Sequence, residues 1–273
     1  MSALLLSVDL EDVRDWVKDG YSYREAVPAN TRQYLDCFHR WGVKATFFVV
    51  GRVARRYPAL IVEIVQAGHE IACHGDMHLQ LDKLTPEAFR QDLLDNIAAL
   101  HDAGANDIKG FRAPTFSLTP ATAWAHDVLA ETGFAYSSSV LPARSPLYGW
   151  PGFGTAAQKM ASGIWELPIT LHDLPGLHVP IAGGVYFRVL PFFLTRWAIG
   201  RQLDRGEPVG TYFHPYDIDV CQERFMHPDL DEKQHLNMLM YIGRARVLRR
   251  LANLQQVFPF QSYGEYVRTA CPA

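Results

Sequence analysis

Short apolar runs alternate with helical segments along most of this 273-residue chain. Lys44–Val50 is rich in β-branched and aromatic residues, which is typical of a buried strand. The segment that follows it has apolar residues at helical spacing and is ended by Gly68. This alternation predicts an α/β protein with parallel strands and helices packed outside them, either as a barrel or as an open doubly wound sheet.

The same reading predicts the other elements and their organisation. Leu141–Ala161 is rich in Pro, Gly and Ala, so we expect a long loop over the site there rather than a domain boundary, and residues 1–273 are predicted to form a single domain. We expect strands at 4–8, 44–50, 69–73, 108–111, 136–139, 164–168 and 209–213 and helices at 30–41, 53–67, 190–204 and 235–255, with further helices from Thr85-Pro86 to Gly104 and from Thr119-Pro120 to Gly133.

Composition narrows the class of protein. The formal net charge of −3 gives no reason to expect nucleic acid or an anionic membrane as partner. Four cysteines lie apart with no CxxC pair, as reduced thiols of a cytosolic protein do. The apolar run Ala3–Val8 ends at Asp9 and is too short for a signal peptide or a membrane span. We therefore expect a cytoplasmic protein with no integral membrane segment.

Two imidazoles and an acidic cluster follow predicted strands. His74 and His78 come after the strand that ends at Cys73, and Asp9, Glu11 and Asp12 come after the first strand. Two histidines and one carboxylate are a usual ligand set for a catalytic metal that keeps positions open for water and substrate. Residues 9 and 11 of a strand face the same side, which favours Glu11 as the third ligand; if the strand bulges or ends at Leu10, Asp12 takes the metal instead.

Three more reactive side chains follow predicted strands. They are Arg112, Glu166 and His214, and α/β folds place their sites at this end of the strands. If these segments meet in space, the chain is a metal-dependent hydrolase.

These residues, in this order, resemble the polysaccharide deacetylase family, also called the NodB-homology or carbohydrate esterase 4 family. The resemblance extends from Leu4 to about Tyr266, and five motifs in sequence make chance a poor explanation. The matching segments are Ser7-Val8-Asp9-Leu10-Glu11-Asp12, Ala45-Thr46-Phe47-Phe48-Val49 with Gly51, His74-Gly75-Asp76-Met77-His78, Gly110-Phe111-Arg112-Ala113-Pro114 and Tyr212-Phe213-His214-Pro215.

The resemblance implies a fold, a reaction and a set of roles. The fold is a distorted (β/α) barrel of about seven strands, and the reaction is hydrolysis of an acyl group, usually N-acetyl, from a sugar. The cofactor is a divalent metal, most often Zn²⁺ and sometimes Co²⁺ or Ni²⁺. Asp9 would be the general base and Arg112 its partner. His214 would be the general acid, supported by a carboxylate; Glu166 is favoured for this over Asp217 and Asp219.

One departure from the family pattern concerns the carboxylate ligand. Many members have two adjacent aspartates, base then ligand, whereas this chain has Asp9-x-Glu11-Asp12. The choice between Glu11 and Asp12 therefore stays open at this point.

Further motifs indicate a branch of the family associated with exopolysaccharide and O-antigen (lipopolysaccharide) gene sets. These motifs are the Asp-x-Glu-Asp start, Gly183-Gly184-Val185-Tyr186-Phe187-Arg188 and His214-Pro215-Tyr216-Asp217-Ile218-Asp219. The expected substrate is a sugar or saccharide linked to a nucleotide or a lipid.

Two rival functions remain. One is a cyclic-amide hydrolase similar to allantoinase, and the other is a non-catalytic glycan-binding member of the family. The oligomeric state is left open.

Overall fold

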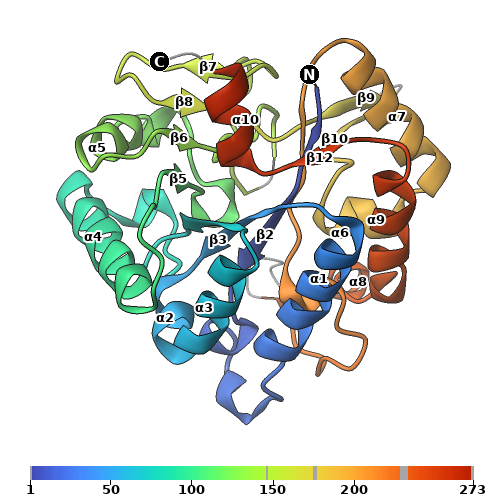
Figure 1. Ribbon diagram of the computed structural model, residues 1–273, viewed down its shortest axis with the longest axis horizontal. Coiled ribbons are helices and arrows are strands. Elements are labelled where there is room, and N and C mark those ends of the chain that lie inside the picture. The colour runs from blue at the N-terminus through green and yellow to red at the C-terminus, as the bar shows by residue number, and fades with distance from the viewer. Residues whose placement is uncertain (1, 146, 175–176, 228–232, 272–273) are drawn as a thin grey trace.

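The computed structural model describes residues 2–145, 147–174, 177–227 and 233–271. Its largest sheet has seven strands and is parallel except at one edge, where β7 runs antiparallel to β8. β1 (Leu4–Leu5) leads into β2 and also pairs in parallel with β11 (Val209–Gly210) and β12 (Phe260–Gln261), so the strands curl into a distorted barrel (Figure 1). In spatial order the seven strands are β2 (Ser7–Leu10), β3 (Thr46–Val49), β4 (Glu70–Cys73), β5 (Gly110–Phe111), β6 (Tyr136–Ser137), β8 (Trp165–Glu166) and β7 (Gln158–Lys159).

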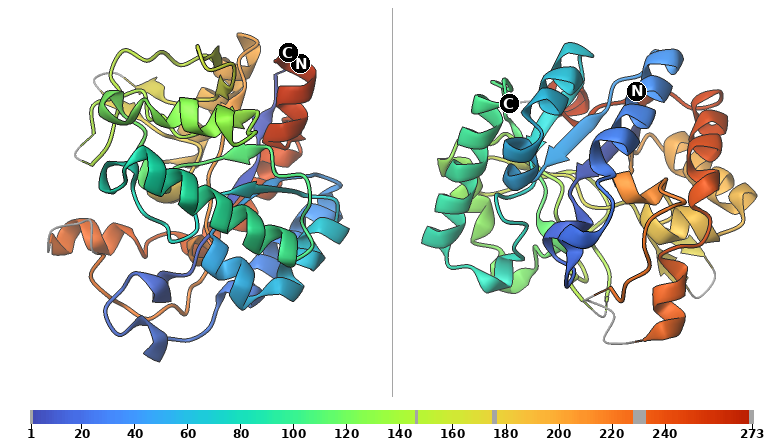
Figure 2. Two further views of the ribbon diagram at one scale, coloured as in Figure 1. Left: turned by 90° about the vertical axis from the view of Figure 1, so that its left-hand side faces the viewer. Right: turned by 90° about the horizontal axis from the view of Figure 1, so that it is seen from below.

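Helices lie on the outside of the strands, as both views of Figure 2 show. Thr85 caps the longest of them, because its hydroxyl accepts a hydrogen bond from the Ala88 N–H at 3.2 Å, as the Thr-Pro sequence predicts. The helices are α1 (Val27–Trp41), α2 (Gly51–Arg56), α3 (Pro58–Gln66), α4 (Pro86–Asp102), α5 (Ala125–Glu131), α6 (Gly184–Val189), α7 (Phe192–Asp204), α8 (Gln234–Leu239), α9 (Val247–Gln255) and α10 (Tyr263–Ala270).

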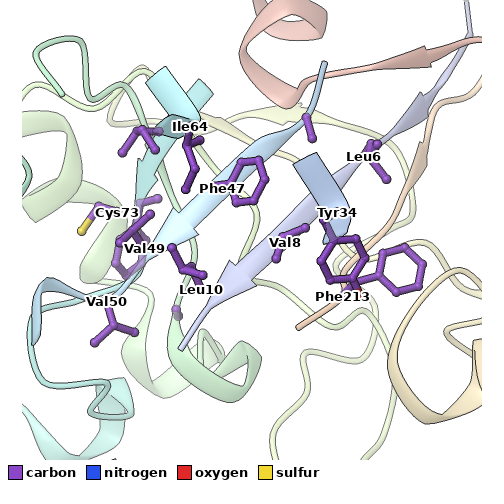
Figure 3. Packing of buried hydrophobic residues seen from close by; sticks show 14 of the residues in the cluster. Leu6, Val8, Leu10, Tyr34, Phe47, Val49, Val50, Ile64, Cys73 and Phe213 are labelled. Atoms are coloured by element: carbon purple, nitrogen blue, oxygen red, sulfur yellow. The ribbon is translucent and has the colours of Figure 1, made fainter. Parts of the chain in front are cut away.

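β2 separates the hydrophobic core from the barrel interior. Leu6, Val8 and Leu10 point towards the helices and pack with core residues of neighbouring elements (Figure 3). Because side chains alternate along a strand, Ser7 and Asp9 point the other way, into the barrel. Both polar side chains are at least 97% buried, so the strand holds them in a fixed orientation.

Two predicted helices are interrupted in the structure. The helix expected at 53–67 is split, because Tyr57 has a non-helical backbone (φ −128°, ψ 55°) before Pro58, which begins α3. The helix expected at 235–255 was wrong. α8 ends at Leu239, and Gly243 takes a left-handed conformation (φ 77°) so close to the Arg188 carbonyl that a Cβ would lie 2.6 Å from it.

The stretch between residues 141 and 187 holds more regular structure than its sequence indicates. β7 pairs with β8, and a two-stranded antiparallel sheet joins β9 (His172–Leu174) to β10 (Leu177–Val179). Leu141, Ala143 and Arg144 nevertheless line the main cavity, where a loop over the site was expected. Among the described residues no helix combines the length and the apolar character needed to cross a bilayer.

Candidate metal centre and active site

The polar residues that follow the strands converge at one end of the barrel. Asp9, Glu11, His74 and His214 all line a cavity of about 710 Å³. Arg112 lies beneath them, fully buried, at the end of β5. Residues more than 200 positions apart in the sequence therefore share one site, because the carboxyl ends of parallel strands meet at one end of the barrel.

Glu11, His74 and His78 form a group that could hold a metal ion. One ligand atom from each lies within 4.8 Å of the other two. The His74 Nδ1–H donates to the Arg112 carbonyl at 2.8 Å, which leaves Nε2 free to bind a cation. Glu11 Oε2 is buried 2.6 Å from His78 Nε2, yet no hydrogen bond is aligned with it. A cation would satisfy this orphaned oxygen, and two His with one Glu is a known donor set for catalytic zinc.

The protonation states suit metal binding. Burial, and then the neighbouring His78, lower the pKa of His74 to about 4, so its imidazole is neutral at pH 7. Burial by itself would raise the pKa of Glu11, but the adjacent histidines, His78 above all, hold that pKa far below its usual value. Glu11 is therefore a carboxylate and His74 a neutral imidazole, which are the forms that bind metals.

Two side chains of α4 fix the loop that carries both histidines. The Asp92 carboxylate accepts the N–H groups of Asp76 and Met77 at 2.9 and 3.2 Å. The Asn96 amide donates to the Gly75 carbonyl at 2.6 Å. The loop ends at His78 with a positive φ of 56°, which is unfavourable for a residue with a Cβ and is typical of functional sites. Neither Asp92 nor Asn96 was identified from the sequence, since both sit in an ordinary helical pattern.

The structure distinguishes between Glu11 and Asp12, the two carboxylates that the sequence leaves open as the third metal ligand. Asp12 does not join the metal group, contrary to the alternative left open above. Its Oδ2 pairs with Arg14 at 2.8 Å and with Arg56 at 2.9 Å, and its Oδ1 caps a short helical turn by accepting the Arg14 N–H. β2 ends at Leu10, but Glu11 keeps to the same side as Asp9, since both carboxylates face His214 Nε2 and line the cavity.

Glu11→Ala and Asp12→Ala should therefore have opposite effects. We expect Glu11→Ala to abolish zinc binding with little loss of stability. Asp12→Ala should keep zinc binding but lower the free energy of unfolding by about 3–5 kcal/mol, because it leaves Arg14 buried without its partner. Zinc titration and denaturant unfolding of both variants check this. Greater zinc loss in Asp12→Ala would make Asp12 the ligand.

Asp9 and Arg112 form a buried ion pair beside the metal group. Arg112 Nη1 lies 2.6 Å from Asp9 Oδ1 and 2.8 Å from Ser7 Oγ, and the guanidinium carbon lies 4.0 Å from the centre of the Phe48 ring. Arg112 also donates through Nε to the Ser138 carbonyl at 3.2 Å. These contacts fix Asp9 Oδ1 and leave Oδ2 directed towards the cavity side, 3.9 Å from His214 Nε2.

A second charged chain ends at His214. Its Nδ1 lies 2.8 Å from Asp217 Oδ2, and Asp217 Oδ1 lies 3.1 Å from Arg188 Nε. Burial lowers the pKa of His214, but the hydrogen bond and charge of Asp217, with Glu11 and Asp9, outweigh it and raise the pKa to about 9. His214 is therefore protonated at neutral pH, with Nε2 facing Asp9 and Glu11.

The predicted support of His214 by Glu166 was wrong. Glu166 lies on the other side of the barrel, where Oε1 accepts the N–H groups of Ser139 and Val140 at 2.7 and 3.0 Å and Oε2 lies 3.2 Å from His126. Asp217 takes that place because it starts a short helical turn three residues after His214. The sequence analysis named Asp217 as an alternative to Glu166.

Tyr216 is a further site residue that the sequence analysis quoted without a role. Its hydroxyl donates to Glu11 Oε1 at 3.0 Å, and its ring stacks on the His214 imidazole with centroids 4.5 Å apart. Tyr216 thereby fixes one oxygen of Glu11 and leaves the other for the metal group.

Family models cover most of the chain. One described as polysaccharide deacetylase matches residues 17–137, and one described as a domain of unknown function, DUF3473, matches residues 138–268. The first match includes both histidines of the metal loop and the second includes His214, while Asp9 and Glu11 precede both.

Curated proteins of known class are similar to parts of the chain. It is 29% identical over 159 residues to the peptidoglycan deacetylase-like protein FGM2 of Gibberella zeae, covering 53% of this chain and 46% of that protein. It is 31% identical over 113 residues to a chitooligosaccharide deacetylase of Bradyrhizobium sp. (strain ANU 289), covering 41% of this chain and 49% of that protein. The matched segments span less than half the length of either relative.

Solved structures share the fold over nearly the whole chain. A Mycobacterium smegmatis protein assigned to the polysaccharide deacetylases has a TM-score of 0.67 at 20% identity, over 98% of this chain and 89% of that one. The allantoinase Puue has a TM-score of 0.64 at 15% identity, over 99% and 92%. A Bacillus anthracis pseudoenzyme of carbohydrate esterase family 4 has a TM-score of 0.53 at 12% identity, over 97% and 65%.

Proposed function

We propose that this chain, whose residues 17–137 match the polysaccharide deacetylase family, hydrolyses an N-acetyl group from a sugar. A divalent cation would assist the reaction, most often Zn²⁺, with Co²⁺ or Ni²⁺ as substitutes. The observation that supports this best is the arrangement of three unlike groups around one cavity. The Glu11–His74–His78 group, the carboxylate of Asp9 and the protonated His214 all border it. Metal-assisted amide hydrolysis uses a cation site, a base and an acid of this kind.

Asp9 is the proposed general base. Arg112 holds Oδ1 at 2.6 Å, so the carboxylate keeps one orientation, and Oδ2 remains to take a proton from the attacking water. A cation bound by Glu11, His74 and His78 would polarise the acyl carbonyl and make that water more acidic. Arg112 is a positioning residue, since it is fully buried beneath the base.

His214 is the proposed general acid. Asp217 and Arg188 fix the imidazole so that Nε2 faces the cavity, 3.6 Å from Glu11 and 3.9 Å from Asp9. Its proton would pass to the leaving nitrogen as the C–N bond breaks.

The proposed substrate is a saccharide precursor of a bacterial surface polysaccharide such as O-antigen, linked to a nucleotide or a lipid and met in the cytoplasm. The exopolysaccharide-type motifs noted above support this branch. A cavity of about 710 Å³ is within the range of sites that take small ligands, roughly 300–1,000 Å³. The aromatic side chains of Trp16, Tyr148 and Tyr186 line it and can stack on sugar rings.

The two rival functions differ at the metal group. Allantoinase shares the fold, and a structural neighbour is a pseudoenzyme, so fold alone does not choose among them. The complete donor set and the separately held base and acid favour hydrolysis of an acyl sugar.

Acetate release tests the proposal. Purified protein is incubated with N-acetylated chitooligosaccharides and with nucleotide-linked N-acetyl sugars, with added zinc and with a chelator. We expect acetate only when the metal is present. Hydrolysis of allantoin without acetate release would favour the cyclic-amide reading, and sugar binding without turnover of any substrate would favour the glycan-binding reading.

The Asp217–His214 pair predicts a pH effect. A general acid works only while protonated, so kcat/KM should fall as pH rises through the pKa of His214. In Asp217→Asn the pKa of His214 loses its chief support, and the alkaline limb should move to lower pH by about one unit or more. Glu166→Gln is the matched control, because Glu166 does not contact His214, and it should leave the limb in place. An unmoved limb in Asp217→Asn would remove His214 from the acid role.

A further inference from the structure

α7 carries large apolar side chains both on its buried side and on its exposed side. Its inner side packs on the core through Ala198, Ile199 and Leu203. Its outer side exposes Phe193 and Trp197, four residues apart, with 70% and 49% of their surface accessible. An exposed pair of aromatic residues on one helix face indicates a surface that meets an apolar partner.

Unpaired arginines surround these two aromatic residues. Arg196 and Arg201 are exposed on α7, and Arg205 is exposed directly after its last residue. Within the described part of the chain, none of the three lies within 4.0 Å of a carboxylate, and Asp204 is the one acidic residue of this helix. By contrast, exposed Arg32 and Arg90 on α1 and α4 are paired with Glu63 and Glu131.

Two more cations come from α9 and from the residue just before it. α7 and α9 lie side by side at the right of Figure 1, where Arg250 of α9 lies over the Phe192 ring at 5.4 Å. Arg246 and Arg249 are exposed beside it. Burial and repulsion from these two arginines lower the pKa of Arg250. We define the basic-aromatic face by the following residues: Phe193, Arg196, Trp197, Arg201, Arg205, Arg246 and Arg249.

We propose that the basic-aromatic face docks on an anionic lipid bilayer, with Phe193 and Trp197 inserted among the headgroups and the arginines on the lipid phosphates. The formal net charge of −3 is a sum over the whole chain, so it does not reveal a local group of arginines. Aromatic residues flanked by arginines are the pattern of helices that lie in the membrane interface. The proposal is independent of the deacetylase function.

Other occupants fit the face less well. In a symmetric dimer formed through it, the arginines of one copy would meet those of the other, since such an interface repeats the same patch. A nucleic acid would satisfy the arginines but leave the Phe193 ring exposed to water.

Docking through this face would place the cavity near the bilayer. α6 lines the cavity through Val185 and Tyr186, and the chain continues from α6 into α7 within three residues. A substrate carried by a membrane lipid would then reach the site without leaving the bilayer.

Flotation of the full-length protein with vesicles tests the proposal. Wild type should bind phosphatidylcholine vesicles that contain phosphatidylglycerol and not vesicles of phosphatidylcholine alone. Arg201→Ala/Arg249→Ala should weaken binding about 25-fold, because each basic residue near an anionic surface contributes roughly a fivefold factor. Phe193→Ser/Trp197→Ser should also weaken vesicle binding. The binding that remains should be fully sensitive to salt, because salt screens the attraction between arginines and lipid phosphates but not the insertion of aromatic rings.

Arg32→Ala/Arg90→Ala is the matched control. It removes the same charge from exposed but paired arginines and should leave vesicle binding unchanged. Thermal unfolding verifies that each variant is folded. The proposal is overturned if wild type ignores anionic vesicles, if the control loses as much binding as Arg201→Ala/Arg249→Ala, or if the face variants instead abolish a dimer or the binding of RNA.

Discussion

Replacing His74 or His78 by alanine is expected to remove bound zinc and deacetylase activity together. Each imidazole supplies one of three donor atoms that lie within 4.8 Å of one another, so its loss leaves too few ligands to retain the cation. We expect zinc affinity to fall by more than about 100-fold, since even partners outside the ligand set contribute about 10–100-fold. Equilibrium zinc titration and acetate release measure the two losses.

His101→Ala is the control for these variants. His101 is exposed on α4 and distant in sequence from the strand ends, so its removal should change neither zinc binding nor turnover. If His74→Ala kept its zinc, the ligand set proposed here would be wrong. If it lost zinc but stayed active, the reaction would not depend on the cation.

Asp9→Asn should leave zinc in place while kcat falls by at least about 100-fold, which is the lower limit for a general base. The amide keeps the size of the carboxylate and a hydrogen-bond acceptor for Arg112, but it cannot take a proton. Zinc content, the unfolding midpoint and kcat of one preparation separate a chemical effect from a structural one.

Asp12→Asn is matched to this variant. It changes a buried acid three residues away that pairs with Arg14 and Arg56 instead of facing the metal group. Its kcat should stay within a few-fold of wild type. A wild-type kcat in Asp9→Asn would contradict the role of Asp9 as the base.

The strands and the side on which Asp9 and Glu11 lie could be predicted because both depend on local periodicity. An apolar run such as Leu4–Val8 specifies a buried strand, and its two-residue repeat places residues 9 and 11 together. The break at Gly243 could not be predicted, because it results from contact with the Arg188 backbone 55 residues earlier. That the chain is one domain stays a prediction.

Which side chains pair with one another in the site was harder to predict than which residues belong to the site. Motif order indicated the histidines, Asp9, Arg112 and His214, but not which carboxylate meets which cation. Glu166 turned away from His214 because two backbone N–H groups, those of Ser139 and Val140, bind it instead. Pairings of this kind depend on how separate loops meet in three dimensions, which no local pattern contains.

Anomalous X-ray diffraction at the zinc edge, from crystals grown with zinc, tests the central claim most directly. We predict a single strong peak bonded to Glu11, His74 and His78, at about 2.0–2.2 Å from each ligand atom, with Asp9 nearby but not coordinated. A strong zinc peak elsewhere, with no density among these three side chains, would contradict the proposed metal centre and the hydrolase built on it.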